Sequence, residues 1–168
     1  DDGSMQWTIS TNTAPSVYEG RLSWNLDYGY LQRSGGSTHT FGQYYTNAYW
    51  IYWRASDSGW RTLFRGNQDH ETIVYSGQKS LGFYSTRNGE FRDTGYDIEL
   101  GQWWFLVVTG VGDSATSHTG TSSYYIGSEV SPPAFVGATD RVCSGVVHYR
   151  LGWPWQGPGR VASAMTWD

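Results

Sequence analysis

The sequence predicts an all-β protein, an antiparallel β-sandwich of the jelly-roll type with about 10 to 13 strands. Aromatic residues are abundant, with ten Trp, thirteen Tyr and six Phe in 168 residues, and such rings suit the half-buried surface of a sheet. The chain also has 22 glycines and only 15% charged residues, as expected for short strands joined by tight turns rather than for long helices. Segments rich in aromatic and β-branched residues recur about every 8 to 14 residues between Gly, Asn, Asp, Ser and Pro.

Taken in chain order, these segments define the expected strands. They are residues 4–10, 20–26, 28–33, 48–55, 60–66, 71–76, 80–86, 102–110, 122–128, 146–151 and 159–167. No gap between them carries the pattern of a crossover helix, so neighbouring strands are expected to be antiparallel. Because no linker, charge run or repeat interrupts the sequence, residues 1–168 are expected to form a single domain.

Alternation of apolar and polar residues predicts which side chains of the expected strand at residues 20–26 are buried. Leu22, Trp24 and Leu26 are expected to point inward, whereas Ser23 and Asn25 are expected to face water.

The same reasoning applies to three later segments. Val161, Met165 and Trp167 share one face of the last segment and are expected to point into the core. Residues 49–53 and 103–108 are apolar on both faces, which predicts central strands covered on each side.

The charge balance limits the kind of partner. A net charge of −4 argues against nucleic acid, which requires a basic face. Lys79 is the one lysine among eleven basic residues, and arginine stacks on aromatic rings, so the surface favours contact with a partner. The longest apolar run, residues 103–108, is far shorter than the roughly 20 residues that cross a bilayer as a helix. We therefore expect no nucleic-acid partner and no membrane span.

Cysteine content and the first residues bear on the compartment. Cys143 is the single cysteine, so no disulfide within the chain and no thiolate metal cage is expected. The sequence begins Asp1-Asp2-Gly3, which is typical of a processed mature protein or of a fragment. An organelle lumen and the extracellular space both stay open.

Several motifs follow one another in a fixed order between residues 20 and 167. They lie at residues 49–54, 60–70, 81–85, 91–98, 101–108, 124–127, 149–153 and 157–162. In this order the sequence resembles the laminin-G-like domains of the concanavalin A-like lectin and glucanase superfamily, particularly versions found in algae and other protists. The strand that begins at Trp103 and the hairpin at residues 125–127 carry much of the resemblance. It implies a jelly-roll sandwich, and domains of this fold often hold calcium at one rim.

An enzymatic role requires a catalytic constellation. Glucanases of this superfamily carry a Glu-x-Asp-x-Glu type of motif, which places carboxylates on one face of a strand. Here Asp69 and Glu71 share a face, but residue 73 is Ile, and the other glutamates are scattered. A G-x-S-x-G nucleophile motif is absent from the sequence, and the four histidines are dispersed. We therefore expect a chain that is not an enzyme, with a glycosidase as the least favoured alternative.

Calcium is the ion that the loop after residue 65 favours. Asn67 and Asp69 offer oxygen ligands two residues apart, and Asp93 with Asp97, or Asp140, would complete a shell. The alternative is that Asn67 and Asp69 stabilise a turn through their side chains.

Aromatic residues outside the expected strands are the candidates for ligand or partner contact. They are Trp153, Trp155, Tyr44 and Tyr45. Sugar rings stack on Trp and Tyr, and the same rings anchor protein interfaces. Trp155 is expected to be the more exposed tryptophan because Pro154 and Gln156 flank it, whereas a core position stays open for Trp153.

Two functions from different classes follow. The first is a non-catalytic binding module that docks, as a peripheral subunit, on other proteins of a larger complex such as an organellar or photosynthetic assembly. The second is a lectin-like domain that binds glycans, with or without Ca²⁺. The lysine-poor surface favours the first function.

Overall fold

A computed structural model of the chain describes residues 6–9, 13–34, 44–55, 59–66, 69–75, 77–112, 119–142 and 150–167. All regular structure within these residues is β-strand, and the strands form two seven-stranded sheets in which every pairing is antiparallel. The predicted all-β sandwich is therefore confirmed. Among the described residues, no helix is long and apolar enough to cross a membrane.

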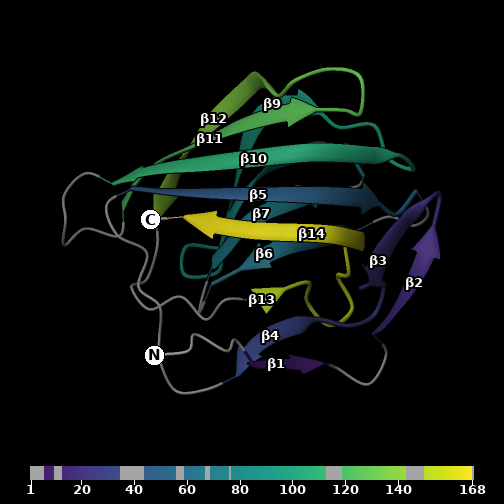
Figure 1. The fold of residues 1–168 in the computed structure, drawn as a ribbon. Helices are drawn as coiled ribbons and strands as arrows, with labels where there is room; N and C mark the ends of the chain where they lie inside the picture. The colour runs from purple at the N-terminus through teal and green to yellow at the C-terminus, as the bar shows by residue number, and fades with distance from the viewer. Residues whose placement is uncertain are drawn as a thin grey trace.

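The two sheets have the following strand orders. The first contains β1 (Gln6–Ile9), β4 (Leu31–Ser34), β13 (Arg150–Leu151), β6 (Trp60–Arg65), β7 (Asp69–Tyr75), β8 (Ser80–Ser85) and β9 (Glu90–Asp97). The second contains β12 (Ala134–Val142), β11 (Thr119–Gly127), β10 (Trp103–Gly112), β5 (Tyr44–Trp53), β14 (Gly159–Trp167), β3 (Arg21–Asn25) and β2 (Ala14–Tyr18). Figure 1 shows β10, β5 and β14 side by side in front of β6 and β7.

The core lies between the sheets and is built around β5. Tyr49, Ile51 and Trp53 are fully buried, and the Tyr49 ring packs against the Phe64 ring at a centroid distance of 6.4 Å. The Tyr124 hydroxyl donates a hydrogen bond of 3.0 Å to the Glu71 carbonyl oxygen, which links the two sheets. These contacts position the strands whose ends carry the surface loops.

Strands β5 and β10 lie centrally in their sheet, as the two apolar runs predicted, but their second face is only partly covered. Tyr49 and Leu106 point into the core and are fully buried. Trp50 and Phe105 point to the other side, where both are half-buried and their rings pack at a centroid distance of 5.2 Å. The expectation that each side is covered is therefore wrong for the outward side.

Three strands were not predicted: β2, β9 and β12. All three lie at the edge of a sheet, and most of their described side chains are exposed or half-buried. An edge strand has fewer neighbours to pack against, so its sequence carries little of the alternating apolar pattern that identifies a strand.

The inward directions predicted for two strands also need correction. Leu26 is buried as expected, but Leu22 is 68% exposed and Ser23 is 1% exposed. The reason is that the guanidinium of Arg21, which lies on the same face as Ser23, packs 4.0 Å above the Trp50 ring. The β2–β3 hairpin thus buries its polar side against the outward face of the second sheet.

In β14 the error arises from a bulge. The pairing of β14 with β5 shifts register between Val161 and Ser163, so residues after the shift change face. Val161 is buried at 3% exposure, whereas Met165 and Trp167 are 43% and 49% exposed. A strict alternation over the whole strand had placed all three in the core.

Candidate functional site

The loop between β13 and β14 presents Trp155 on a tight turn. The Gln156 backbone N–H donates a hydrogen bond of 3.0 Å to the Trp153 carbonyl oxygen, so Pro154 and Trp155 are the central residues. Proline followed by a residue with φ of 68° has the features of a type II turn, in which glycine is usual at the second central position. Trp155 therefore occupies a strained backbone conformation, and its side chain is 88% exposed.

A second loop, residues 26–30, packs directly against this turn. The Leu26 backbone N–H donates a hydrogen bond of 2.7 Å to the Gly159 carbonyl oxygen. A Cβ atom on Gly157 would lie 1.8 Å from the Leu26 carbonyl oxygen, so the two backbones touch. We call the surface formed by loops 26–30 and 152–158 the rim site.

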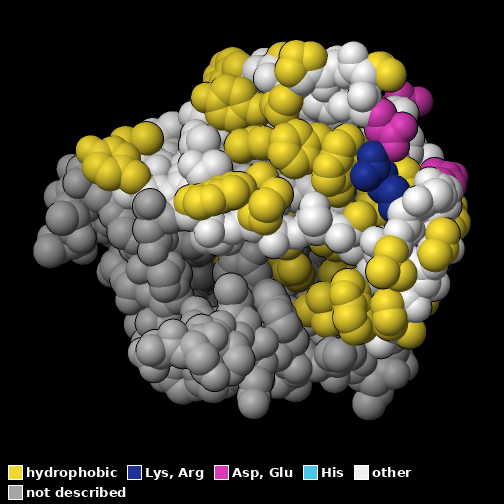
Figure 2. Space-filling model, viewed as in Figure 1, with side chains coloured by type: hydrophobic (Ala, Val, Ile, Leu, Met, Phe, Trp, Pro, Cys, Tyr) yellow, Lys and Arg dark blue, Asp and Glu magenta, His cyan; other side chains and the backbone are white. Residues whose placement is uncertain are grey.

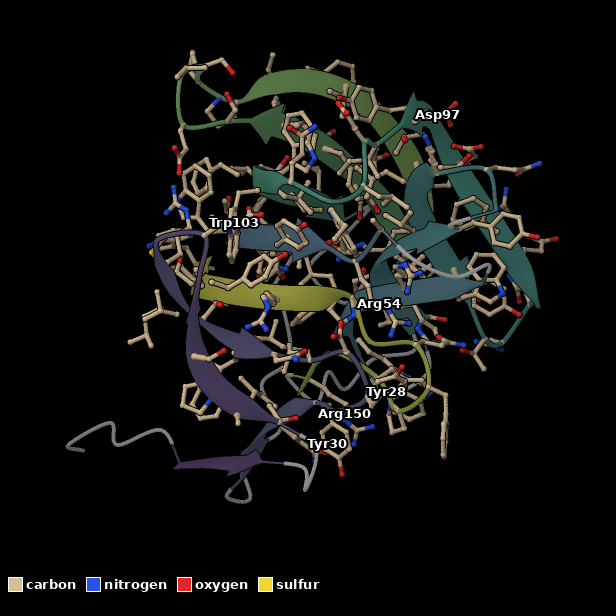
Figure 3. The ribbon with its side chains drawn as sticks, turned by 90° about the vertical axis from the view of Figure 1, so that its right-hand side faces the viewer. Tyr28, Tyr30, Arg54, Asp97, Trp103 and Arg150 are labelled. Carbon is tan, nitrogen blue, oxygen red and sulfur yellow. The ribbon has the colours of Figure 1, made fainter. Side chains whose placement is uncertain are left out.

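Arginine side chains stack on the aromatic rings of the rim site. The Arg65 guanidinium carbon lies 3.5 Å from the centre of the Trp153 ring, and that of Arg150 lies 4.7 Å from it. Arg150 also lies 4.8 Å from the Tyr30 ring, beside which Figure 3 shows it. These cation–π contacts fix the Trp153 ring, which is half-buried.

The neighbouring pair in the rim site is Arg54 and Tyr28. The guanidinium carbon of Arg54 lies 5.2 Å from the Tyr28 ring, and its Nε atom lies 3.9 Å from the Asp27 carboxylate. Tyr28 remains 60% exposed. Figure 3 shows Arg54, Tyr28, Arg150 and Tyr30 one below another on the side that faces the viewer, so this side of the molecule carries an array of rings and guanidinium groups.

Beneath the rim site, a buried chain of hydrogen bonds connects the loop to the first sheet. The Thr62 hydroxyl donates to the Gln156 side-chain oxygen at 3.0 Å and lies 2.7 Å from Nδ1 of His70. Because the single hydroxyl hydrogen is used towards Gln156, we assign the His70 tautomer that donates from Nδ1. Burial, and then the charge of Arg65, lower the pKa of His70 to about 3, so the ring is neutral at pH 7.

The four predicted ligand-contacting aromatics do not come together. Trp153 and Trp155 both lie in the rim site. Tyr44 is 59% exposed, but it begins β5, whose other end leads to the rim site, about 30 Å away at the usual strand rise. Tyr45 requires a correction: it is 3% exposed in the core, where its hydroxyl lies 3.1 Å from the Ser122 hydroxyl. Alternation along β5 places the two tyrosines on opposite faces.

The structure describes one of the two predicted calcium ligands, Asp69. Asn67 lies outside the described residues. Asp69 is 2% exposed at the start of β7, and its charge acts on Arg65 beneath the rim site. Within the described part of the chain, no group of three or more His, Cys, Asp or Glu side chains is arranged to hold a metal ion. Calcium binding through Asn67 and Asp69 therefore stays a prediction.

Sequence reasoning missed the remaining rim residues, Tyr28, Tyr30, Arg54, Arg65 and Arg150. Tyr28 and Tyr30 lie in a segment interpreted as a strand, whereas the strand begins only at Leu31. The three arginines come from separate parts of the chain, and the order of the strands is what gathers them. The preference for arginine over lysine was the one signal in the sequence.

Two antiparallel sheets packed face to face in this way define a β-sandwich. No protein-family model matches the sequence, and a search of curated proteins finds no significant match. Solved structures do resemble it. Domain 4 of AbnA, a GH43 extracellular arabinanase from Geobacillus stearothermophilus solved in complex with arabinotriose, has a TM-score of 0.60 and 16% identity, over 99% of this chain and 84% of that chain.

A native heptameric SAP-like pentraxin from Limulus polyphemus is also similar in structure. Its TM-score is 0.52 and its identity 16%, over 98% of this chain and 76% of the pentraxin chain. At such identities the likeness shows the fold, and the function has to be argued from this chain's own residues.

Proposed function

We propose that this chain is a non-catalytic, lectin-like module of the laminin-G-like kind that binds carbohydrate at the rim site. The observation that carries the proposal is Trp155, which is 88% exposed at a backbone φ of 68°. The fold accepts strain at this position to present a tryptophan where glycine would be relaxed. Strain that persists in this way is typical of functional positions.

The chemistry of the rim site suits a saccharide. Sugar rings have apolar C–H faces that pack on aromatic rings, and Trp155 and Tyr28 offer such rings to solvent. Arg54 and Gln156, both partly exposed, can donate hydrogen bonds to hydroxyl groups. The arabinanase domain that was solved with arabinotriose has the same type of fold, which supports the proposal.

The non-catalytic part of the proposal is supported by burial. Glycoside hydrolysis requires two carboxyl groups that reach the sugar. Asp69 and Glu71, the carboxylates that the sequence placed on one face, are 2% and 1% exposed. Neither side chain is open to a polymer at the surface. Release of reducing sugar from any glycan by the purified protein would contradict this proposal.

Replacing Trp155 by glycine tests the proposed site. The Trp155→Gly variant is expected to unfold at the same temperature as the unmodified protein or a higher one, because glycine relaxes the turn. Its affinity for oligosaccharides is expected to fall roughly 30-fold, about 2 kcal/mol, as for the loss of a central aromatic anchor. A glycan array identifies the ligand, and calorimetric titration with and without Ca²⁺ measures affinity.

The matched control is Lys79→Gly. Lys79 also has a positive φ, 57°, in an exposed turn, so its replacement relaxes the backbone in the same way without touching the rim site. It should leave glycan affinity unchanged. Equal affinity of the Trp155→Gly and Lys79→Gly variants, or silence of the unmodified protein across all glycans, would rule out this function for the rim site.

A second candidate is the role of a peripheral subunit that docks on a larger protein complex. The outward face of the second sheet favours it, because Tyr44, Phe135 and Trp167 are each about half exposed there, at 59%, 60% and 49%. Exposed apolar faces of this kind mark interaction surfaces. Native extracts should then hold the protein in a particle with an interface above roughly 1,000 Å². Elution of the native protein at the mass of the free chain would contradict the docking role.

A further inference from the structure

The outward face of the second sheet carries large apolar side chains on five neighbouring strands. Its large exposed side chains are Phe135 on β12, Val111 on β10, Tyr44 on β5, and Met165 and Trp167 on β14, with exposures of 60%, 50%, 59%, 43% and 49%. The half-buried side chains between them are Tyr125, Phe105, Val107 and Trp50. We call these nine residues the outer face, and Figure 2 shows hydrophobic side chains spread over this side of the molecule.

The strand register makes one apolar row of the outer face continuous across the five strands. Phe135 pairs with Tyr125, at a ring centroid distance of 5.6 Å, and Tyr125 pairs with Val107. Ala48 continues the same row from Val107 to Met165. Residues paired in register on one face of a sheet lie about 5 Å apart, so this row is unbroken. The next row along the same face is polar over Ser123, Thr109 and Thr46, and Val111 and Tyr44 lie beyond it.

The exposed area is large enough to hold a partner. An aromatic side chain presents about 150–250 Å² when fully exposed, so five large residues at about half exposure present on the order of 500 Å². Each partner contributes roughly 800 Å² to a standard stable interface, so these five residues alone would supply more than half of it. This apolar area lies at or above the upper end of what an ordinary monomer exposes.

Charge is confined to the ends of the outer face. Arg21 stacks on Trp50 at one end, and its charge is neutralised by Glu129, whose carboxylate lies 2.6 Å from the guanidinium. Figure 2 shows the basic and acidic side chains of this view gathered at that end. Asp140, which is exposed on β12 beside Thr121, carries a negative charge at the other end. Between these ends the described outward side chains of the five strands carry no charge, so two copies can meet there without like-charge repulsion, as a two-fold interface requires.

We infer that the outer face binds the outer face of a second copy of this chain, forming a two-fold dimer. The second candidate function, docking on a larger complex, was argued from the same outward face. This inference names a second copy of the chain as the partner that binds there. The dimer is independent of carbohydrate binding, because Gly159 and Trp53 lie at the end of β14 and β5 that leads to the rim site. Trp167 and Tyr44, which belong to the outer face, lie at the opposite end of these strands.

The mass of the protein in solution tests the dimer. Sedimentation equilibrium from about 1 to 100 μM, a range that brackets ordinary dimer affinities, is expected to give twice the chain mass of 18.9 kDa at the upper concentrations. Phe135→Asp and Tyr44→Asp each place a charge on the outer face, and each is expected to weaken dimerisation at least tenfold. Both side chains are largely exposed, so the fold should persist, and circular dichroism checks this.

Leu22→Asp is the matched control. Leu22 is 68% exposed but lies on the opposite side of the β2–β3 hairpin from Arg21, outside the outer face. This variant should dimerise like the unmodified protein. A monomer at every concentration, or a dimer weakened equally by Leu22→Asp, would overturn the inference. So would a monomer that binds a different protein through this face, although that result would support the docking function.

Discussion

Replacing Gly157 by alanine is expected to destabilise the protein by about 3 kcal/mol, the upper range for overpacking. The added Cβ atom would lie 1.8 Å from the Leu26 carbonyl oxygen and 2.3 Å from that of Asp27. Both are backbone atoms, so no side chain can move to relieve the overlap. Loop 26–30 is also held by the hydrogen bond of 2.7 Å between Leu26 and Gly159. For a chain of this length the loss corresponds to a fall of roughly 10 °C in the unfolding temperature.

Gly77→Ala provides the comparison for this prediction. Gly77 is exposed in a turn, and its added Cβ atom would only touch the Tyr75 ring at 3.4 Å, an ordinary contact distance. Its φ is not positive, so alanine adds no strain there and should change stability by less than about 1 kcal/mol. Thermal unfolding followed by circular dichroism measures both variants. If the two unfold at the same temperature, the two rim loops are not in backbone contact.

The central strands were predictable because their burial leaves a local signal. The runs that form β5 and β10 are apolar on both faces, and both strands lie in the middle of a seven-stranded sheet. The edge strands β2, β9 and β12 lack that signal because many of their side chains face solvent and do not have to be apolar. A strand with Pro15 and mostly exposed side chains, as in β2, is stabilised by pairing with its neighbour rather than by its own pattern.

The rim site was only half predictable. Trp155 could be identified because Pro154 and the neighbouring glycines define a turn, and turns expose their side chains. Arg65 and Arg150 could not be identified, because their contact with Trp153 depends on β13 pairing with β6. Such pairing is set by the packing of the whole sandwich. The direction of Met165 could not be predicted either. It depends on the register shift in β14, which leaves no local signal in the sequence.

Lowering the pH from 6.5 to 5 is expected to reduce the free energy of unfolding by about 2 kcal/mol through His70 alone. In the folded protein the pKa of His70 is lowered to about 3, by burial and by the charge of Arg65, from its usual value of 6.5. Between these two values the unfolded chain binds a proton that the folded chain does not bind. Stability is therefore complete above pH 6.5 and falls by about 1.4 kcal/mol per pH unit as the pH decreases towards 3.

His70→Gln separates this effect from other titrations. Glutamine can still donate a hydrogen bond to the Thr62 hydroxyl, but it does not titrate. Most carboxylates titrate below pH 5, and the other three histidines, at positions 39, 118 and 148, are present in both proteins. Urea unfolding at pH 6.5 and pH 5 should therefore show a smaller loss for His70→Gln, by about 2 kcal/mol. Equal losses would mean that Nε2 of His70 accepts a proton in the folded protein as readily as in the unfolded chain, so that burial and Arg65 do not lower its pKa.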